Sequence, residues 1–357
     1  MRSLPTARAL ALLAVLFAAP AAAVEPLDFG EAARRTLASH PDTRRLAAEL
    51  EAAEARTTLA AQRPPFDAGA ELENVAGSGA ARGVDGAEFT LSLGSAFERG
   101  GKRAARVAAA ERGLDLLSID QRVAALDRLA ETGRRFVALA AAQERVEIAL
   151  AALAQADTTL ALIRPRVAAA RSPRTELLNA EIERSRADAE VEAAHRAVVA
   201  AQAALAAQWG APQARPTVAL ALLDVPEPAP SQALAAAVAT TPDLERFATE
   251  ERLADARLEL ARAQAVTDWR WQIGVRRLQE SRDQALVAGV SLPIGQARRA
   301  EPEIRERRAD VARVQASAVA RRVELERLVI EESERLHALR RQVQAITDVQ
   351  LPRAREA

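Results

Sequence analysis

The chain has 357 residues, of which 49% are hydrophobic and 27% charged, a composition that indicates a folded protein rather than a disordered one. Its 49 basic and 49 acidic residues cancel, which argues against bulk nucleic-acid binding. The absence of cysteine excludes a disulfide framework, a Cys-ligated zinc site, a cysteine nucleophile and a Cys-linked lipid anchor.

Residues 1–23 have the pattern of a secretory signal peptide. Arg2 and Arg8 supply positive charge, Ala9 to Ala18 form a short apolar run, and Ala21 to Ala23 offer a small-residue cleavage site. The alternative is a membrane-anchoring helix, but the apolar run is too short to span a bilayer. No later apolar stretch of about 18 residues is evident, so no transmembrane helix is expected. The sequence predicts an exported chain.

The remainder has the signature of an internal duplication. His40-Pro41-Asp42 is similar to Thr241-Pro242-Asp243 at an offset of 201 residues, and Phe97 and Ile294 each close an apolar segment at an offset of 197. Ala/Glu/Arg helices also resemble each other by composition alone. The repeated order of elements favours the duplication, with a first copy over residues 24–209 and a second over 231–357.

Each copy reads as helix, strand, turn, strand and long helix. The opening helices are predicted over residues 27–62 and 231–266. Between the copies, residues 210–230 contain five prolines and indicate a linker or an irregular equatorial segment.

Four segments alternate apolar and polar residues with a period of two: about 66–76, 86–97, 268–278 and 285–294. Each has about the 9–11 residues that a tilted strand needs to cross a bilayer. The loops 77–86 and 279–284 are predicted to join them into two hairpins.

The two faces of these strands differ in chemistry. Five of the nine Phe and Trp residues after residue 23 lie on the apolar face, as in outer-membrane barrels. A soluble sandwich with the same core face is the alternative. The predicted lipid-facing residues are Phe89, Leu91, Leu93, Trp269, Trp271, Val290 and Leu292. The predicted lumen residues are Glu71, Glu73, Glu88, Thr90, Arg270, Gln272 and Arg276, whose polarity also suits any wetted surface.

Four strands cannot close a barrel, and an open sheet edge cannot lie in lipid. Strands in a membrane therefore require several chains in one barrel, and three chains would supply twelve strands.

Residues 100–171 have a helical pattern, with Pro165 near its end. Leu139, Val146, Leu153, Leu160 and Val167 recur every seven residues, and a mostly Ala series follows three residues after each, a coiled-coil pattern. The chain is expected to turn at Ser172-Pro173 and to return as a helix through 174–209. The result is a long α-hairpin.

Several motifs resemble the TolC-like outer-membrane efflux family and its cobalt–zinc–cadmium branch. They are Glu71 to Asn74, Phe97 to Arg103, Val290 to Ile294 and the hairpin turn Ser172 to Glu181. The similarity extends over nearly all of the chain after residue 23. Ala96 departs from it, because the family usually has proline before the strand-closing Phe.

The resemblance implies a mainly α protein with a membrane β-barrel part: a homotrimer with a twelve-stranded barrel and an α-helical tunnel. It implies an exit duct in the outer membrane that works passively with a periplasmic adaptor and an inner-membrane pump and exports heavy-metal cations. Drug efflux and type I secretion are alternative roles, and a periplasmic coiled-coil structural or adaptor protein is an alternative of another class. The adaptor would meet the hairpin tip, formed by Ser172, Pro173, Arg174, Thr175, Glu176, Leu177 and Leu178.

The second copy is predicted to end within its outgoing helix. Phe97 lies 75 residues before Ser172, and the same separation after Ile294 places a second hairpin tip near position 369, beyond Ala357.

No catalytic constellation is evident. His40, His195 and His337 lack metal-ligand spacing, and the Arg-rich run from Arg298 to Arg327 is interleaved with acids, which is typical of a salt-bridged helix surface. The sequence therefore predicts no enzyme, cofactor or metal site and no nucleic-acid partner.

Overall fold

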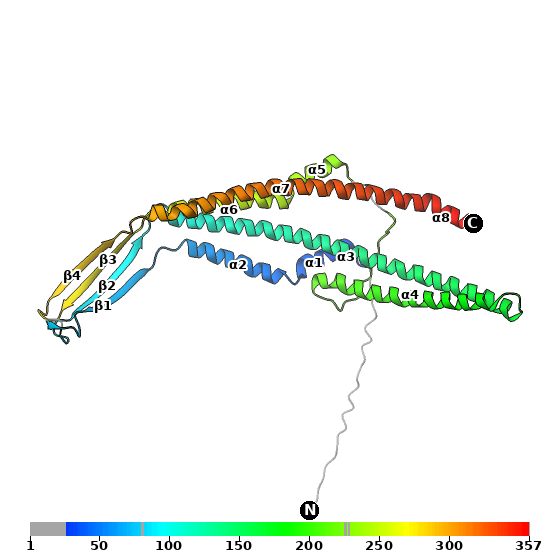
Figure 1. The fold of residues 1–357 in the computed structure, drawn as a ribbon, viewed down its shortest axis with the longest axis horizontal. Helices are drawn as coiled ribbons and strands as arrows, with labels where there is room; N and C mark the ends of the chain where they lie inside the picture. The colour runs from blue at the N-terminus through cyan, green and yellow to red at the C-terminus, as the bar shows by residue number, and fades with distance from the viewer. Residues whose placement is uncertain (1–25, 80–81, 225–226, 228, 357) are drawn as a thin grey trace, which may run out of the picture. The chain divides into compact units, whose positions relative to one another are not determined.

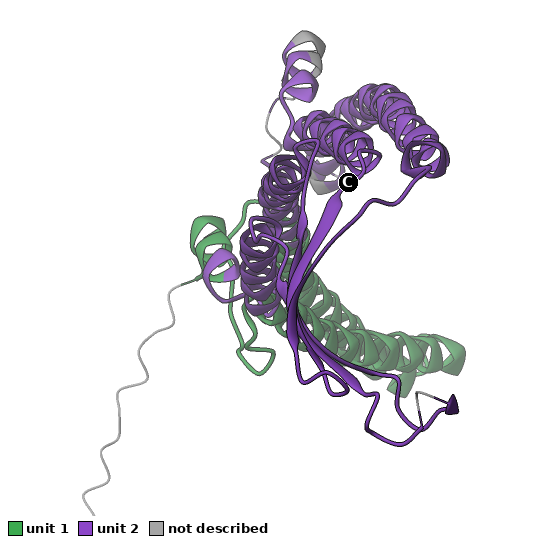
Figure 2. Ribbon diagram, turned by 90° about the vertical axis from the view of Figure 1, so that its left-hand side faces the viewer, with its two compact units in different colours: residues 1–35, 132–222 green, residues 36–131, 223–357 purple. Residues whose placement is uncertain are grey.

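A computed structural model describes residues 26–79, 82–224, 227 and 229–356. The predicted signal peptide lies outside the described residues. The chain forms two compact units, residues 1–35 with 132–222 and residues 36–131 with 223–357 (Figure 2). They do not coincide with the two predicted copies, because helix α3 (Lys102–Ala168) continues from one unit into the other at residue 132.

The opening helix of each copy is broken by proline, so the predictions of single helices over 27–62 and 231–266 were wrong. The first is α1 (Phe29–Ser39) followed by α2 (Thr43–Ala60), and the second is α5 (Ser231–Ala239) followed by α6 (Pro242–Gln264). Proline restrains the residue before it and has no N–H to donate. The breaks fall at Pro41 and Pro242, 201 residues apart, which supports the duplication.

The larger unit contains one antiparallel sheet in the order β1-β2-β3-β4 (Figure 1). The strands are β1 (Phe66–Glu73), β2 (Glu88–Phe97), β3 (Trp269–Leu278) and β4 (Gln284–Ser291), close to the predicted segments. Each copy supplies one hairpin, as predicted, and β2 pairs with β3 to join the hairpins. Strands β1 and β4 are the edges of this sheet.

Two strands end earlier than predicted. β4 ends at Ser291 instead of Ile294, because Pro293 cannot donate to a ladder and disfavours regular pairing around it. β1 ends at Glu73 instead of residue 76, because Asn74 and Ala76 adopt left-handed φ values of 57° and 56°.

In the larger unit, ion pairs link the helices that continue from the sheet. Between α3 and α6, Arg246 contacts Asp120 at 2.6 Å and Arg122 contacts Glu245 at 2.9 Å. Arg321 of α7 (Gln296–Ala345) contacts Asp243 of α6 at 2.5 Å. Beyond α7 the chain remains helical through a π-helical segment (Ile346–Gln350) and α8 (Leu351–Glu356).

The smaller unit contains the predicted hairpin of α3 and α4 (Arg174–Ala206), and a short 3-10 turn follows at Ala207–Trp209. Leu139 and Leu205 are fully buried in one core cluster, and Val146 packs with Ala149 and Ala194 in another, which confirms the seam at these positions. The main chain of Val218 exchanges two 3.1 Å hydrogen bonds with the Gln143 side chain. The first part of the 210–230 segment is thus fixed against the helices.

Among the helices of the described residues, only α3 has an 18-residue window apolar enough to cross a membrane, and 17% of that window is buried. This corrects the expectation that no such stretch follows residue 23. Alanine, which is abundant in α3, contributes to this apolar character.

Candidate functional site: a two-faced sheet and its polar junction

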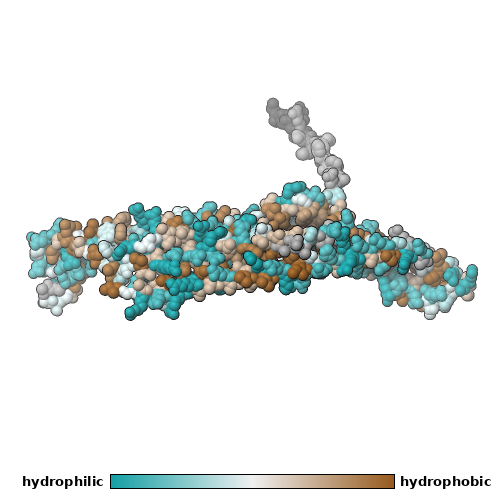
Figure 3. All heavy atoms as spheres, turned by 90° about the horizontal axis from the view of Figure 1, so that it is seen from above, coloured by the Kyte–Doolittle hydropathy of each residue, from teal (hydrophilic) through white to brown (hydrophobic). Residues whose placement is uncertain are grey.

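One face of the sheet presents large apolar side chains to its surroundings. Figure 3 shows hydrophobic residues exposed among hydrophilic ones on the surface seen in that view. Cross-strand partners share a face, and the pairs Leu91↔Val275 and Trp271↔Val290 define this one. Leu91 is 54% exposed and Val290 72% exposed. The seventh predicted lipid-facing residue, Leu292, lies just beyond β4. The other six lie on this face: Phe89, Leu91, Leu93, Trp269, Trp271 and Val290.

All seven predicted lumen residues lie on the opposite face: Glu71, Glu73, Glu88, Thr90, Arg270, Gln272 and Arg276. A hollow of about 680 Å³ is lined largely from this side, by residues that include Asp67, Gly94, Gln272 and Ser291. Of the predicted lumen residues, Arg270 and Gln272 line this hollow.

Near the hairpin turns, the polar side chains form a cluster around Arg276. Its guanidinium contacts Glu73 at 2.9 Å and Glu88 at 2.7 Å, and its Nε donates to the Thr90 hydroxyl at 3.0 Å. The structure thus brings together four of the seven predicted residues. The remaining three, Glu71, Arg270 and Gln272, are exposed on the same face.

Two glycines on the polar face, Gly94 and Gly274, have no room for a side chain. The alternation of apolar and polar residues did not predict this role. A Cβ on Gly274 would lie 2.6 Å from the Leu91 carbonyl oxygen, and one on Gly94 would lie 2.8 Å from the Trp271 carbonyl oxygen. At Gly289, also on this face, a Cβ would meet nothing within 4 Å. Glycine in a strand marks close backbone approach or bending. At Gly94 and Gly274 the neighbouring strand approaches so closely that only glycine fits without a shift of the backbone.

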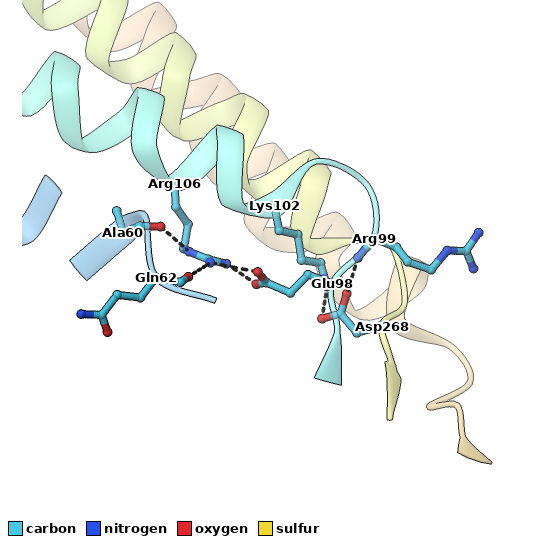
Figure 4. A network of polar contacts seen from close by, with 7 residues as sticks. All are labelled: Ala60, Gln62, Glu98, Arg99, Lys102, Arg106 and Asp268. Atoms are coloured by element: carbon cyan, nitrogen blue, oxygen red, sulfur yellow. Dashed lines mark hydrogen bonds and ion pairs between the residues drawn. The ribbon is translucent and has the colours of Figure 1, made fainter. Parts of the chain in front are cut away.

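Where the sheet meets the helices, seven residues form a polar network, here called the junction cluster: Ala60, Gln62, Glu98, Arg99, Lys102, Arg106 and Asp268 (Figure 4). The carboxylate of Asp268, just before β3, accepts from the Lys102 ammonium at 2.7 Å and from the Arg99 main-chain N–H at 3.0 Å. Lys102 opens α3, and only 10% of its side chain is exposed. This pair therefore ties the first copy to the second.

Arg106 connects three segments within the same cluster. It forms an ion pair with Glu98 and donates to the carbonyls of Ala60 at 3.4 Å and Gln62 at 3.2 Å, where α2 ends. The hydrogen bonds that Arg106 donates to the Glu98 carboxylate raise the pKa of Arg106 above its ordinary value, so the guanidinium stays charged at all physiological pH values. The strand-to-helix turn is thereby held against the end of α2.

Replacing Asp268 by Asn is expected to destabilise the protein by about 3 kcal/mol, because the largely buried Lys102 ammonium loses its counter-charge. Adding Lys102→Met should recover much of that loss. The control is Arg103→Met, since Arg103 is exposed beside Lys102. Thermal denaturation followed by circular dichroism measures all of these variants. Equal melting temperatures for the Asn variant and the unmodified protein would contradict a stabilising role for the pair.

The hairpin tip lies in the smaller unit and is closed by helix-capping geometry. Ala170 has a φ of 54°, and the N–H of Arg171 donates to the Arg166 carbonyl at 2.8 Å, a Schellman-type end to α3. Pro173 precedes α4 in an extended conformation. Of the predicted tip residues, Ser172 and Leu177 are partly buried. The rest are exposed: Pro173, Arg174, Thr175, Glu176 and Leu178.

These features define a structural class before any comparison: a mainly helical chain that combines a two-faced, four-stranded antiparallel sheet with long helices. Within the described residues, no group of three or more His, Asp or Glu side chains is placed to hold a metal ion. The candidate functional features are thus the two faces of the sheet and the junction cluster.

Comparison with known proteins identifies the family. The model described as outer membrane efflux protein matches residues 32–211, and the chain belongs to this family. The cobalt-zinc-cadmium resistance protein CzcC of Cupriavidus metallidurans is 26% identical over 270 residues. The match covers 75% of this chain and 64% of that relative, so the chain spans less than two thirds of its length.

Solved structures show the same fold. A membrane protein from Pseudomonas aeruginosa matches with a TM-score of 0.69 and 20% identity, covering 91% of this chain and 78% of the other. CusC, whose structures concern transmembrane channel formation, matches with a TM-score of 0.64 and 16% identity, covering 92% and 78%. The expected TolC-like fold and the efflux family are confirmed.

Proposed function

We propose that this chain is one subunit of a homotrimeric duct in the outer membrane, through which an inner-membrane pump and a periplasmic adaptor export heavy-metal cations. The duct itself is passive, and the pump supplies the energy. The predicted lipid-facing residues contact outer-membrane lipid, and the predicted lumen residues line the pore.

The single observation that carries this proposal is the two-faced sheet with edges at β1 and β4. Its apolar face is exposed, as a lipid-facing surface would be, and its other face is polar and hollow. In lipid, unpaired edge groups cost several kcal/mol each, so β4 must pair with β1 of another copy. Three chains close a barrel of twelve strands.

An unpartnered helix face supports further chains around the duct. Val319, Val323 and Ile330 of α7 are each more than 60% exposed, and they recur at spacings of four and seven residues. Such a stripe is typical of a helix that packs against another helix. In the proposed trimer, a helix of the neighbouring chain packs against this stripe of α7.

The charge of the polar face supports cations as the cargo. At the end nearest the hairpin turns, this face carries three acidic residues, Glu71, Glu73 and Glu88, and one basic residue, Arg276. Rings of net negative charge favour cation passage. The resemblance to the cobalt-zinc-cadmium resistance protein points the same way.

Deleting the gene is expected to sensitise cells to cobalt, zinc and cadmium, and expression of this chain with its pump and adaptor should restore growth. Growth curves over a range of metal concentrations measure the effect. Sensitivity to hydrophobic drugs alone would contradict metal export and favour the drug-efflux alternative.

Leu178→Asp is expected to weaken adaptor binding at least about tenfold, equivalent to about 1.4 kcal/mol, because it replaces an exposed apolar side chain of the tip with a charge. Val199→Asp is the matched control: Val199 is also exposed on α4, 21 residues from Leu178. Affinity measured by biolayer interferometry with the purified adaptor tests this. Equal losses for the two variants would place the docking site elsewhere.

A further inference from the structure

The carboxylates of Glu73 and Glu88 belong to residues that face each other directly across the first hairpin. Glu73 is the last residue of β1 and Glu88 the first of β2, and the two are partners in the register of this pairing. Opposite side chains of an antiparallel pair have Cβ atoms about 5 Å apart, and like charges in such a pair are destabilising. This end of the polar face therefore requires a positive charge close to both acids.

Arg276 supplies that charge from the second hairpin. Its guanidinium contacts Glu73 at 2.9 Å and one oxygen of Glu88 at 2.7 Å, and its Nε donates to the Thr90 hydroxyl at 3.0 Å. The other carboxylate oxygen of Glu88 accepts from the Asn74 amide at 3.0 Å. Oxygen atoms from two strands thus converge on a single cation that a third strand provides.

The Glu73 carboxylate depends on this cation. Its Oε2 atom is shielded from solvent and makes no hydrogen bond within the described part of the chain, although the side chain as a whole is 40% exposed. The ion pair with Arg276 is made by this same oxygen. A shielded carboxylate oxygen without a counter-charge is costly, so removal of Arg276 would leave Glu73 in need of another cation.

Carboxylate oxygens are also ligands for divalent metal ions, Zn²⁺ among them. The position that holds the guanidinium therefore suits a divalent cation as well, and the two cannot occupy it together. Their competition matters in a duct for cations, because an ion must be attracted strongly enough to enter and held weakly enough to leave. Two adjacent carboxylates without a resident cation would retain it.

We infer that Arg276 is a specificity-determining residue of the proposed duct: as a tethered cation, it fills the position between Glu73 and Glu88 that a divalent metal ion would otherwise occupy. The inference rests on the proposed function. The polar face still attracts cations, because Glu71 is exposed opposite Thr90 and the cluster itself has two acids and one base. Arg276 lets these cations pass without being trapped.

Zinc binding to the whole protein tests whether Arg276 fills such a position. Isothermal titration calorimetry uses the detergent-solubilised protein, purified with a tag that lacks histidine. Arg276→Gln is expected to bind Zn²⁺ at least about tenfold more tightly than the unmodified protein, because two neighbouring carboxylates are left to share one ion. Arg277→Gln is the matched control: it removes the same charge at the next residue of β3, on the opposite face, where Arg277 pairs with Phe89.

Two further variants separate a vacated cation position from a change in net charge. Arg276→Lys keeps a tethered cation, so its affinity for Zn²⁺ should stay within about twofold of that of the unmodified protein. Arg276→Gln/Glu88→Gln removes one of the two carboxylates and should lose the gain. If Arg276→Gln weakens the fold, Zn²⁺ should raise its melting temperature and leave that of Arg277→Gln unchanged. An equal gain in Arg277→Gln, or a gain that survives loss of Glu88, would overturn the inference.

Currents through single channels in planar lipid bilayers test the consequence for conduction. Zn²⁺ is expected to block the Arg276→Gln channel at a concentration at least about fivefold lower than the unmodified channel requires, because the ion is retained between the two carboxylates. The Arg277→Gln channel should match the unmodified one. Equal block of conducting Arg276→Gln and unmodified channels would refute the inference alone. An unmodified protein that forms no channel would refute the proposed function, and the role of Arg276 in conduction with it.

Discussion

Leu286→Arg is expected to prevent assembly in the outer membrane, whereas Val287→Arg is tolerated. Leu286 is 89% exposed on the apolar face of β4 and is paired with Val275, which pairs in turn with Leu91 of β2. An Arg at mid-bilayer costs about 2–4 kcal/mol, and a trimer carries the substitution in every chain. Val287 lies next to it but on the polar face, opposite Gly274, where an Arg can extend into water.

Membrane fractionation followed by native gel electrophoresis measures this difference. The Leu286 variant should accumulate in the soluble periplasmic fraction or be degraded, while the Val287 variant remains in the membrane. Normal assembly of the Leu286 variant would count heavily against a lipid-facing role and would favour the periplasmic coiled-coil alternative.

Gly274→Ala is expected to destabilise the sheet by about 1–3 kcal/mol per chain, the usual effect of overpacking. Its new methyl group would lie 2.6 Å from the Leu91 carbonyl oxygen and 3.2 Å from the Ser92 Cβ, so the backbone of β2 must move. Gly289→Ala is the matched control, because a Cβ there meets nothing within 4 Å.

The temperature at which the detergent-solubilised oligomer dissociates provides the measurement. The Gly274 variant should dissociate at a clearly lower temperature, and the Gly289 variant should behave like the unmodified protein. Equal behaviour of the two variants would mean that β2 adjusts without cost and that Gly274 has no special part in bending the sheet.

Strand positions and faces were predictable because they depend on local sequence. The alternation in residues 88–97 and 269–278 assigns each side chain to a face regardless of how the strands pair. The helix breaks at Pro41 and Pro242 were also readable, since both prolines were part of the repeated motif. The helical periodicity on either side of each proline nevertheless predicts one continuous helix.

Contacts across the sheet and at its junction were beyond sequence reasoning. Lys102 and Asp268 are 166 residues apart, and nothing in either segment indicates the other as its partner. Glu73, Glu88 and Arg276 were each predicted to face the lumen, but their ion pairs depend on the registers of two strand pairings. Such pairings follow only when the order β1-β2-β3-β4 is known.

The most direct test of the central claim is the native mass of the complex extracted in detergent from the outer-membrane fraction. The proposed duct predicts an assembly of three copies of the chain. A monomer in that fraction, or recovery of the chain only from the soluble periplasm, would contradict it.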